Sequence, residues 1–492
     1  MSRTSGPNDL LLAVDRAADL PLRDQIAEQL REAIRSRRLR PGVVLPAGRT
    51  LAADLGVSRG VVVEAYEELR EQGFVEMRPR SAPRVREGAD SPLPAGPDGS
   101  PPPRYDLVPE LPDLGLFPRR AWSQALQLAL RTAPDRAFDY GDPRGDERLR
   151  RVLADYRGRA RGVVAAPEQI DVCQGSIQAV DLACRVVASL GGRSIGLEDP
   201  CADGLRRAAP GAGLSFIPIP VDARGAEVER LVASSADAAI VTPAHQFPSG
   251  VTMTAARRER LLAWARSGGV VIEDDYDAEF FYDGRPAGAL QGEAPDSIVY
   301  VGSASKTLAP AIRLGWAVMP RRLADRAAEL KAALDGGSPA PEQIALAHMI
   351  ETAAFERHVR RTRVEYGRRR EALLGALAAA MPRARIAGER AGLHLAARLP
   401  ASVDRAALEQ AALAARIRMF MLESFMHDPP AIGSSLLIGY GRLPAAAAEP
   451  AVAALAGVLG PVSQGSRGTV AGLPRSGSVA ACPPPSRAAA SG

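Results

Sequence analysis

A break in composition at residues 87–104 is the strongest constraint on how this chain folds. The segment reads EGADSPLPAGPDGSPPPR, is rich in Pro, Gly and Ser, and has almost no large apolar side chain. Such a composition cannot bury a core and is typical of a semi-extended linker. We therefore predict that the 492-residue chain forms two domains, at residues 10–86 and 105–460, with a polar tail at 1–9 and a disordered tail at 461–492.

The bulk composition excludes several classes of protein. No run of about 18 uncharged apolar residues occurs, so no transmembrane helix is expected. The N-terminus lacks the apolar core of a secretory signal. The four cysteines have neither metal-ligand nor disulfide spacing, which predicts no metal site and fits a reducing cytoplasm. The net charge of +5 permits nucleic-acid binding without requiring it.

Lysine is scarce in this chain. Lys and Arg total 62, yet only Lys306 and Lys331 are lysines. Arg can replace Lys as a surface charge, but its guanidinium stays protonated and cannot form an imine. The surviving lysines are therefore candidates for covalent chemistry, the alternative being survival by chance. Lys331, in AAELKAALDGG, fits that alternative, as part of an ordinary helix that ends at a glycine.

The N-terminal part has the periodicity of short amphipathic helices. PLRDQIAEQLREAIRSRRL spaces its apolar residues on one helical face. A second short helix, in RTLAADLG, is ended by Gly56, and Ser58 is a suitable N-cap for a third helix from Arg59 to about Glu71. Two short helices joined by a glycine-containing turn indicate a helix-turn-helix. Residues 74–85 are predicted to form a β-hairpin wing.

The helix-turn-helix geometry suggests which residues contact DNA. The second helix of this motif enters the major groove with its N-terminal residues toward the bases. Ser58 and Arg59 occupy that position, and Arg49 starts the preceding helix. Helix N-termini also bind phosphate. We predict DNA contacts by Arg49, Ser58 and Arg59, beside a wing that carries Arg78, Arg80, Arg84 and Arg86.

This segment resembles the GntR class of winged helix-turn-helix regulators. Nearly all of the pattern PGxxLPSxRxLAxxLGVSRxTVxxAYxxLxxxG is present. Val61 replaces the usual Thr, and the wing reads RPRSAPRV where the class tends to have RPGSGTYV, so the turn glycines of a hairpin tip are missing. The alternative interpretation is a helical hairpin used only for dimerisation.

The C-terminal part alternates helical patterns with short apolar runs. RSIGLED, AAIVTPA, GVVIEDD and SIVYVGS are the clearest runs. Such alternation predicts an α/β domain with a largely parallel central sheet. Ligands of open α/β sheets bind at the carboxyl ends of the strands. Candidate site residues follow these runs or start nearby helices: Gly175, Ser176, His245, Asp274, Tyr276, Ser303, Ser305, Lys306 and Arg313.

These residues resemble those of fold-type-I aminotransferases. The run SASKTLAPAIRLG is the most diagnostic, and YGDPRG, TPAHQFPSG and EDDYDAEF agree in order and spacing. With the N-terminal segment, residues 10 to about 445 resemble the MocR/GabR-type transcription regulators. The resemblance implies a mostly parallel sheet with a smaller C-terminal α+β subdomain, and pyridoxal 5′-phosphate (PLP) as cofactor.

The resemblance also assigns roles. PLP is an electron sink that a lysine holds as an imine, with an acidic partner on its pyridine nitrogen. Lys306 matches that lysine, Asp274 that acid and Tyr276 the phenol beside the ring oxygen. Tyr140 matches a tyrosine that reaches the partner's phosphate across a dimer interface, and His245 is expected to line the pocket. Gly175, Ser176, Ser303, Ser305 and Arg313 match the phosphate site, where hydroxyls, amides and a guanidinium suit a dianion.

Each residue also has a simpler interpretation. Lys306 could be a surface lysine, and Arg313 part of a structural ion pair. The acidic run EDDYD could be a solvated strand end or a cation site. Tyr140 and Tyr276 could be aromatics at the edge of the core. It is their joint occurrence in one order that favours a cofactor site.

Two departures from the family pattern bear on function. Ala202 stands in DPCADG where the family has an aromatic residue stacked on the cofactor, a contact worth about 0.5–1.5 kcal/mol. Leu436 and Leu437 stand where aminotransferases carry the Arg that binds the substrate carboxylate, and Arg442 lies in a different register. Without that Arg, efficient amino-acid transamination is not expected.

Together these features predict a cytoplasmic, PLP-responsive transcription regulator. It would bind an operator in double-stranded DNA as a homodimer and respond to PLP, alone or with a small amine or amino acid. Two alternatives remain: a working aminotransferase, and a regulator whose C-terminal domain is only a dimerisation scaffold.

Overall fold

The computed structural model describes residues 12, 14–16, 21–35, 38–77, 81–86, 103–282, 287–388 and 391–465. For residues 35, 401–402 and 461–465 only the backbone is described. The predicted tail at 1–9, most of the predicted linker and most of the C-terminal tail lie outside this set, as do Arg78 and Arg80 of the wing.

The N-terminal part is a three-helix domain with a two-stranded wing. Its elements are α1 (Leu22–Arg35), α2 (Gly48–Leu55), α3 (Arg59–Glu71), β1 (Val75–Glu76) and β2 (Arg84–Val85). The antiparallel wing pairs Val75 with Val85. Ile26, Leu30 and Ile34 of α1 are fully buried against the rest of this domain, as their helical spacing predicts. The predicted winged helix-turn-helix is confirmed.

Local signals in the sequence set the ends of these helices. Gly56 follows α2 with a φ of 64°, a left-handed conformation that favours glycine. Ser58 is the N-cap of α3, and its Oγ accepts a hydrogen bond from the Val61 amide at 3.4 Å. The turn between α2 and α3 therefore has the predicted capping residues at both ends.

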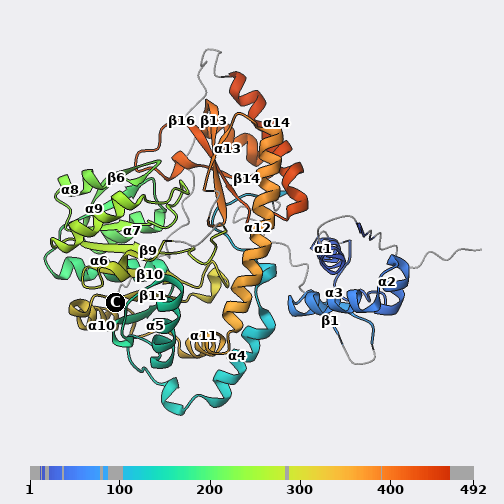
Figure 1. Cartoon of the computed structure of the whole chain (residues 1–492), viewed down its shortest axis with the longest axis horizontal. Helices are drawn as coiled ribbons and strands as arrows, with labels where there is room; N and C mark the ends of the chain where they lie inside the picture. Colours follow the sequence, from blue (N-terminus) through green and yellow to red (C-terminus); the bar gives the residue numbers. More distant parts are fainter. Residues whose placement is uncertain are drawn as a thin grey trace, which may run out of the picture.

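An eight-stranded sheet forms the centre of the C-terminal part (Figure 1). Its spatial order is β4-β11-β10-β9-β8-β5-β6-β7. The run from β10 through β9, β8 and β5 to β6 is parallel, whereas β11 pairs antiparallel with both β10 and β4. The strands are β4 (Ile170–Cys173), β5 (Ser194–Asp199), β6 (Ser215–Asp222), β7 (Gly225–Ala226), β8 (Ala238–Val241), β9 (Val270–Asp274), β10 (Ile298–Ser303) and β11 (Gly315–Val318).

Helices bury both faces of this sheet, so its central strands are mostly apolar. Alternate residues of β10 face opposite sides: Val299 and Val301 pack with α6, α7 and α10, whereas Tyr300 packs with α4, α5 and α11. The helices are α4 (Arg119–Thr132), α5 (Glu147–Arg161), α6 (Ser176–Ser189), α7 (Asp203–Gly211), α8 (Val228–Ala233), α9 (Ala255–Arg266), α10 (Arg321–Asp335) and α11 (Ala340–Glu351). The predicted α/β fold with a mostly parallel sheet is confirmed.

A smaller subdomain follows the long helix α12 (Ala354–Ala380). Its four-stranded sheet has the order β12-β13-β16-β15. The elements are β12 (Arg385–Ala387), β13 (His394–Asp404), β15 (Phe420–Met421), β16 (Ile432–Gly439), α13 (Arg405–Ala414) and α14 (Ala448–Gly465); β14 (Ile417–Arg418) pairs with β3 (Tyr105–Asp106) outside that sheet. Short 3₁₀ turns lie at Leu114–Leu116, Asp135–Phe138, Pro167–Gln169, Leu290–Glu293, Pro310–Ile312, Leu422–Phe425 and Ala445–Ala447.

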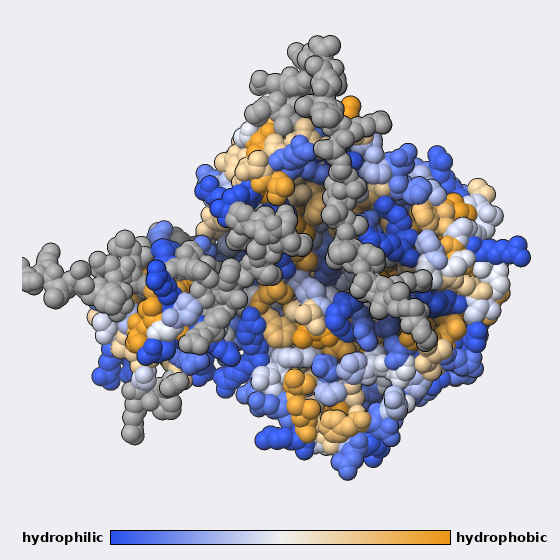
Figure 2. Space-filling view, turned by 180° about the vertical axis from the view of Figure 1, so that it is seen from behind, coloured by the Kyte–Doolittle hydropathy of each residue, from blue (hydrophilic) through white to orange (hydrophobic). Residues whose placement is uncertain are grey.

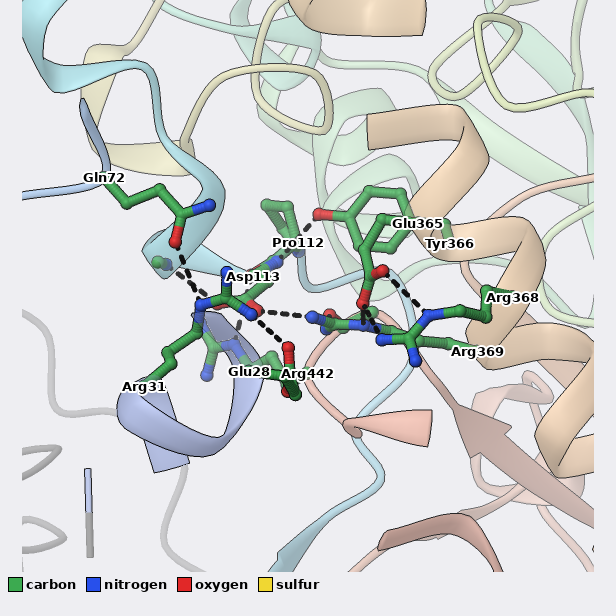
Figure 3. A network of polar contacts seen from close by, with 12 residues as sticks. Glu28, Arg31, Gln72, Pro112, Asp113, Glu365, Tyr366, Arg368, Arg369 and Arg442 are labelled. Carbon is green, nitrogen blue, oxygen red and sulfur yellow. Dashed lines mark hydrogen bonds and ion pairs between the residues drawn. The ribbon is translucent and has the colours of Figure 1, made fainter. Parts of the chain in front are cut away.

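The segment between β3 and α4 is tied to α12 by polar contacts (Figure 3). The Asp113 amide donates to the Tyr366 hydroxyl at 2.9 Å, and Arg369 of α12 lies 2.9 Å from the Asp113 carboxylate. Both α12 side chains are buried. We call residues 110–113 the entry strap, because they lead the chain from β3 into the large domain.

The helix-turn-helix domain lies beside α12 and the start of α4 (Figure 1). Glu71 and Arg361 form an ion pair at 3.7 Å across this contact. A Cβ on Gly73 would lie 2.7 Å from Cδ of Arg119, so the two domains approach closely there. From behind, hydrophilic residues are spread over the described surface of both domains, with smaller apolar patches between them (Figure 2).

Candidate cofactor and DNA-binding sites

A cavity of about 340 Å³ opens where β9 and β10 end. The two subdomains of the C-terminal part both contribute to its wall. It is lined by Glu110, Leu111, Ser176, Ile177, Ala202, Asp203, Leu205, Thr242, Phe247, Asp274, Tyr276, Ser303, Ser305, Lys306, Pro310, Arg313 and Phe425. The structure therefore brings together seven of the ten residues predicted for this site.

Asp274, the last residue of β9, is a buried acid of the sequence motif EDDYD that lines the cavity. Burial first, and then the charge of Asp275, raise the pKa of Asp274 to about 7. Its Oδ1 is buried and has no hydrogen-bond partner within the described residues. A buried acceptor of this kind requires a donor, and a protonated heterocyclic nitrogen would supply one.

The other acids of this run each have a structural partner. Glu273 accepts from the amides of Leu290 and Gln291 at 2.9 and 3.0 Å. Asp275 forms a two-bonded ion pair with Arg161, at 2.7 and 3.1 Å. These contacts explain the acidic run without a solvated strand end or a cation site, and they leave Asp274 as the acid that faces the cavity.

Tyr276 is buried and lines the cavity, whereas His245 lies behind it. The His245 Nδ1 is 3.1 Å from the Tyr276 hydroxyl and 2.7 Å from Asp277. His245 was predicted to line the pocket, but it is not among the lining residues. It contacts the hydroxyl of the lining residue Tyr276 from behind. Phe247 of the same loop lines the cavity instead, and its ring lies 6.3 Å from that of Tyr276 between centroids.

Lys306 reaches into the cavity from the loop after β10. Its Nζ donates to the backbone oxygen of Glu110 at 2.8 Å and lies 3.9 Å from the Glu110 carboxylate. Lys306 is the only lysine among the lining residues. The other lysine, Lys331, is buried in α10 in an ion pair with Asp335 at 3.0 Å. The predicted helix ending at Gly336 is confirmed, but Lys331 is a core residue rather than a surface one.

One end of the cavity suits an anion. Ser176 is the first residue of α6, and the Ser303 and Ser305 hydroxyls lie 2.8 Å apart. Gly175 precedes the helix with a φ of 95°, and a Cβ there would lie 2.7 Å from a guanidinium nitrogen of Arg313. The positive φ favours glycine at this position, close to the guanidinium. Helix amides, hydroxyls and a cation together form a phosphate-type cradle.

The stacking position is occupied differently from the family pattern. Ala202 lines the cavity, as its place in DPCADG predicts, and offers no ring. Phe425 of the smaller subdomain lies close by, because its backbone oxygen accepts from the Cys201 amide at 3.2 Å. Its ring contacts that of Phe247 at a centroid distance of 5.1 Å. Phe247 and Phe425 were not predicted, and no spacing in the sequence links them to position 202.

Leu436 and Leu437, which stand where aminotransferases carry the Arg that binds the substrate carboxylate, both pack in apolar clusters. Leu437 is fully buried and packs with Phe247, Tyr276 and Ala396. Leu436 faces the other core. Arg442 contacts the Pro112 oxygen at 3.4 Å and Asp106 at 3.1 Å, so its guanidinium is engaged away from the cavity.

Two further residues near Lys306 were not predicted. Glu110 is buried in the entry strap, and its Oε1 lies 2.6 Å from Nδ1 of His394. His394 begins β13 and is fully buried. Glu110, His245 and His394 could each offer one metal-ligand atom within 4.8 Å of the others. Hydrogen bonds to protein already engage both nitrogens of His394, the second one to the Pro248 oxygen at 3.0 Å.

Tyr140 lies outside the cavity. Its side chain is 88% exposed, in the turn before α5. That turn borders a second, open hollow of about 820 Å³, which Phe138 also lines. Cys173 ends β4 and Cys184 lies in α6; both are buried.

The predicted DNA contacts share one exposed edge of the N-terminal domain. Arg49 is the second residue of α2, and Ser58 and Arg59 start α3; all three are exposed. This arrangement leaves the N-terminus of α3 open to a ligand. Arg84 and Arg86 of the wing are described, and Arg84 donates to the Gly42 oxygen at 2.5 Å.

Comparison with known proteins agrees with both halves of this architecture. Residues 22–85 match the model of the gntR family of bacterial regulatory proteins, and residues 111–432 match that of aminotransferase class I and II. The chain is 31% identical to the probable rhizopine catabolism regulatory protein MocR of Rhizobium meliloti, over 88% of this chain and 92% of that one. This chain is a MocR-type transcriptional regulator. It is also 32% identical to the pyridoxine biosynthesis regulator PdxR of Corynebacterium glutamicum, over 78% of this chain and 85% of that one.

Solved structures show the same fold for the C-terminal part of this MocR-type regulator. The Pyrococcus horikoshii kynurenine aminotransferase aligns with a TM-score of 0.65 at 25% identity, covering 72% of this chain and 90% of that one. A multiple substrate aminotransferase of Thermococcus profundus aligns with a TM-score of 0.66 at 24% identity, covering 74% and 92%. Domains of this aminotransferase class typically bind PLP. No helix in the described ranges is both long and apolar enough to span a membrane.

Proposed function

We propose that this regulator binds PLP in the cavity and that the bound cofactor changes how its helix-turn-helix domains bind operator DNA. The observation that carries the proposal is the unpartnered, buried Oδ1 of Asp274 in the same cavity as Lys306. A pyridine nitrogen would satisfy that atom, and the only lysine of the wall would bind the aldehyde covalently. No other described residue of the wall could replace that lysine, because Arg does not form imines.

The remaining residues fit the other parts of the cofactor. Tyr276 would donate to the ring oxygen, and it is oriented by His245 and Asp277. Ser176, Ser303, Ser305 and Arg313 would hold the phosphate at the N-terminus of α6, where Gly175 lets the backbone approach. When bound, PLP supplies an aldehyde that captures amines and a ring that withdraws electrons. With Leu437 in place of a carboxylate-binding Arg, this domain would serve sensing rather than efficient transamination of amino acids.

Absorbance spectroscopy tests the proposal. The full chain incubated with PLP and freed of excess should absorb in the visible, and Lys306→Ala should not. Lys306→Arg keeps the charge but cannot bind the aldehyde, so it should also fail. Equal absorbance in all three proteins, or none in the wild type, would contradict PLP binding and favour a scaffold role. Rapid bleaching with amino acids would instead favour an aminotransferase.

Coupling to DNA requires a second measurement. Duplexes selected by the wild-type protein from a random-sequence pool should bind with different affinity with and without PLP. A ligand shifts such an equilibrium only if it favours one arrangement of the domains. Unchanged affinity, with PLP shown to be bound, would contradict a PLP-responsive regulator.

The proposal includes a cytoplasmic homodimer with shared sites. Tyr140 is exposed beside Phe138 and the open hollow, where a second copy could reach it. Two helix-turn-helix domains would also gain affinity from effective concentration. A mixed dimer of Tyr140→Phe and Lys306→Ala chains should regain one site of wild-type PLP affinity. A monomer in sedimentation at micromolar concentration, or a mixed dimer without that site, would contradict sharing.

A further inference from the structure

Glu110 places a carboxylate beside Lys306 in the cavity. The other charged lining residues are the cations Lys306 and Arg313, the buried Asp274, and Asp203, whose side chain is largely exposed to solvent. Arg313 belongs to the phosphate-type cradle and Asp274 to the pyridine position. Glu110 is the acid that remains close to Lys306, with 3.9 Å between its carboxylate and the Lys306 Nζ.

The backbone holds Glu110 in an uncommon conformation. Its φ of 63° is in the left-handed region, which a non-glycine residue occupies at a cost. Lys306 bonds its carbonyl oxygen, and three residues on, Asp113 ties the entry strap to Tyr366 and Arg369 of α12 (Figure 3). The strap is therefore anchored on both sides, and the Glu110 side chain is directed toward the site.

The Glu110 carboxylate is only partly satisfied by protein. Its Oε1 takes the 2.6 Å contact with His394, whereas its Oε2 is buried without a hydrogen-bond partner in the described residues. Burial alone would raise the pKa of Glu110, but the His394 hydrogen bond and the charges of His394, Lys306 and His245 hold it below its ordinary value. The contacts with His394 and Lys306 therefore favour the carboxylate form, and one of its oxygens has no protein donor in the described residues.

Part of the cavity wall is aromatic. Phe247 and Phe425 line the cavity with their rings in contact, and Leu437 is fully buried against Phe247 and Tyr276. Arg442 is the arginine nearest to Leu437 in the sequence, and its guanidinium contacts Asp106 and the Pro112 oxygen. A carboxylate on a ligand would therefore meet the carboxylate of Glu110 and an apolar wall. Among the described lining residues only Arg313 offers a guanidinium, and that residue belongs to the phosphate-type cradle.

From this charge pattern we infer that the ligand recognised beside the cofactor is a small primary amine with a hydrocarbon body and no carboxylate. The inference rests on the proposed PLP binding and narrows the effector from amines or amino acids to amines. Glu110 attracts the ammonium and repels a carboxylate, and the aromatic rings of Phe247 and Phe425 accommodate the hydrocarbon.

Calorimetric titration of the PLP-loaded full chain tests this selectivity. The probes are butylamine, 4-aminobutanoate, L-alanine and butanoate; butylamine and 4-aminobutanoate share a four-carbon chain and differ in the carboxylate. Butylamine should bind more tightly than 4-aminobutanoate or L-alanine by about tenfold or more. Butanoate should not bind measurably.

Variants of Glu110 identify the source of the preference. Glu110→Gln keeps the size but removes the charge, so it should weaken butylamine, strengthen 4-aminobutanoate and bring their affinities within about threefold. Glu110→Gly removes the charge and also relieves the positive φ, which provides a second variant if the first folds poorly. Asp203→Asn is the matched control, because Asp203 also lines the cavity but its side chain is 58% exposed. It should leave the ratio unchanged.

Several results would overturn the inference. One is equal affinity of the wild type for butylamine and 4-aminobutanoate, and another is tighter binding of 4-aminobutanoate or L-alanine than of butylamine. A third is a preference for butylamine that persists in both Glu110→Gln and Glu110→Gly. If PLP binds through Lys306 but the preference is absent, the inference fails while the proposed function stands. If PLP does not bind at all, both fail.

Discussion

The helix-turn-helix domain and the aminotransferase-type domain place their candidate functional residues in opposite surroundings. Arg49, Ser58 and Arg59 are exposed on the N-terminal domain. Asp274 and Tyr276 are buried in the C-terminal one, among acids that each have an assigned partner. Exposed contacts change binding with little effect on folding, whereas buried charges couple function to stability. The four predictions below test that difference, from the largest expected effect to the smallest.

The largest effect is expected at the buried ion pair behind the cofactor motif. Arg161 and Asp275 have side chains only 3% and 1% exposed. Arg161→Ala would leave the Asp275 charge buried without its partner, so the domain should lose about 3–5 kcal/mol of unfolding free energy. Urea unfolding followed by near-ultraviolet circular dichroism measures this. A loss below about 1 kcal/mol would show that water reaches Asp275 and that this region is less closed than described.

The ionised carboxylate of Asp274, which the proposed cofactor would need, should destabilise the cofactor-free fold. Its folded pKa of about 7 lies above the ordinary 3.8, so the unfolded state releases its proton first and ionisation favours unfolding. The penalty should grow from about pH 4 to pH 7, to at most about 4 kcal/mol. Asp274→Asn should therefore stabilise the PLP-free protein relative to wild type, increasingly as the pH rises to 8, while PLP affinity falls.

Unfolding curves of both proteins at pH 5 and pH 8 check this prediction. The difference between them isolates Asp274 from other buried acids, since Asp171, Glu198 and Glu273 also have a pKa raised to about 7. A stability difference that does not change with pH would mean that Asp274 titrates normally.

Loss of the Arg59 side chain should weaken DNA binding without changing stability. Arg59→Ala should cost about 1–3 kcal/mol of DNA-binding free energy if the residue reads a base, and leave the unfolding temperature unchanged. Fluorescence anisotropy with duplexes selected by the wild type measures binding, and its dependence on salt should be steep. Arg23→Ala, an exposed arginine on α1 paired with Asp24, is the control. If both Arg49→Ala and Arg59→Ala keep wild-type affinity, α3 is not oriented as proposed.

The smallest effect is expected at the N-cap of α3. The Ser58 hydroxyl accepts from the Val61 amide at 3.4 Å, a long hydrogen bond on an exposed residue. Ser58→Ala should cost about 0.5–1 kcal/mol of unfolding free energy, and Ser58→Asp should recover it. Thermal unfolding of the two variants gives the comparison. No recovery in the aspartate variant would indicate that the hydroxyl is not used as a cap.

The elements and most of the cavity could be predicted because short-range signals carry them. Gly56 and Ser58 end and begin helices by their own conformational preferences. The loops after β9 and β10 bring Asp274 and Lys306 together because parallel neighbouring strands end at the same edge. The helix ends follow from local sequence, and the meeting of Asp274 and Lys306 follows from the parallel order of neighbouring strands.

The residues that were missed come from long-range contacts. Glu110 meets His394 from a segment 284 positions away, and the contact depends on how the entry strap and β13 pack. Phe425 reaches Ala202 from the smaller subdomain. No periodicity links such positions, so only the folded structure shows that Glu110 and the two phenylalanines line one cavity, with Leu437 buried against Phe247.

The scarcity of lysine gives this protein unusual chemoselectivity. Apart from the amino terminus, its only primary amines are Lys306, which faces the cavity, and Lys331, which is 1% exposed in the core. Reagents that modify amines would therefore have a single accessible side chain to attack. Borohydride reduction of the PLP-loaded chain should fix one label, on the peptide that contains Lys306. The scarcity of competing amines thus makes the cavity a site that can be tagged in the whole protein without mutation.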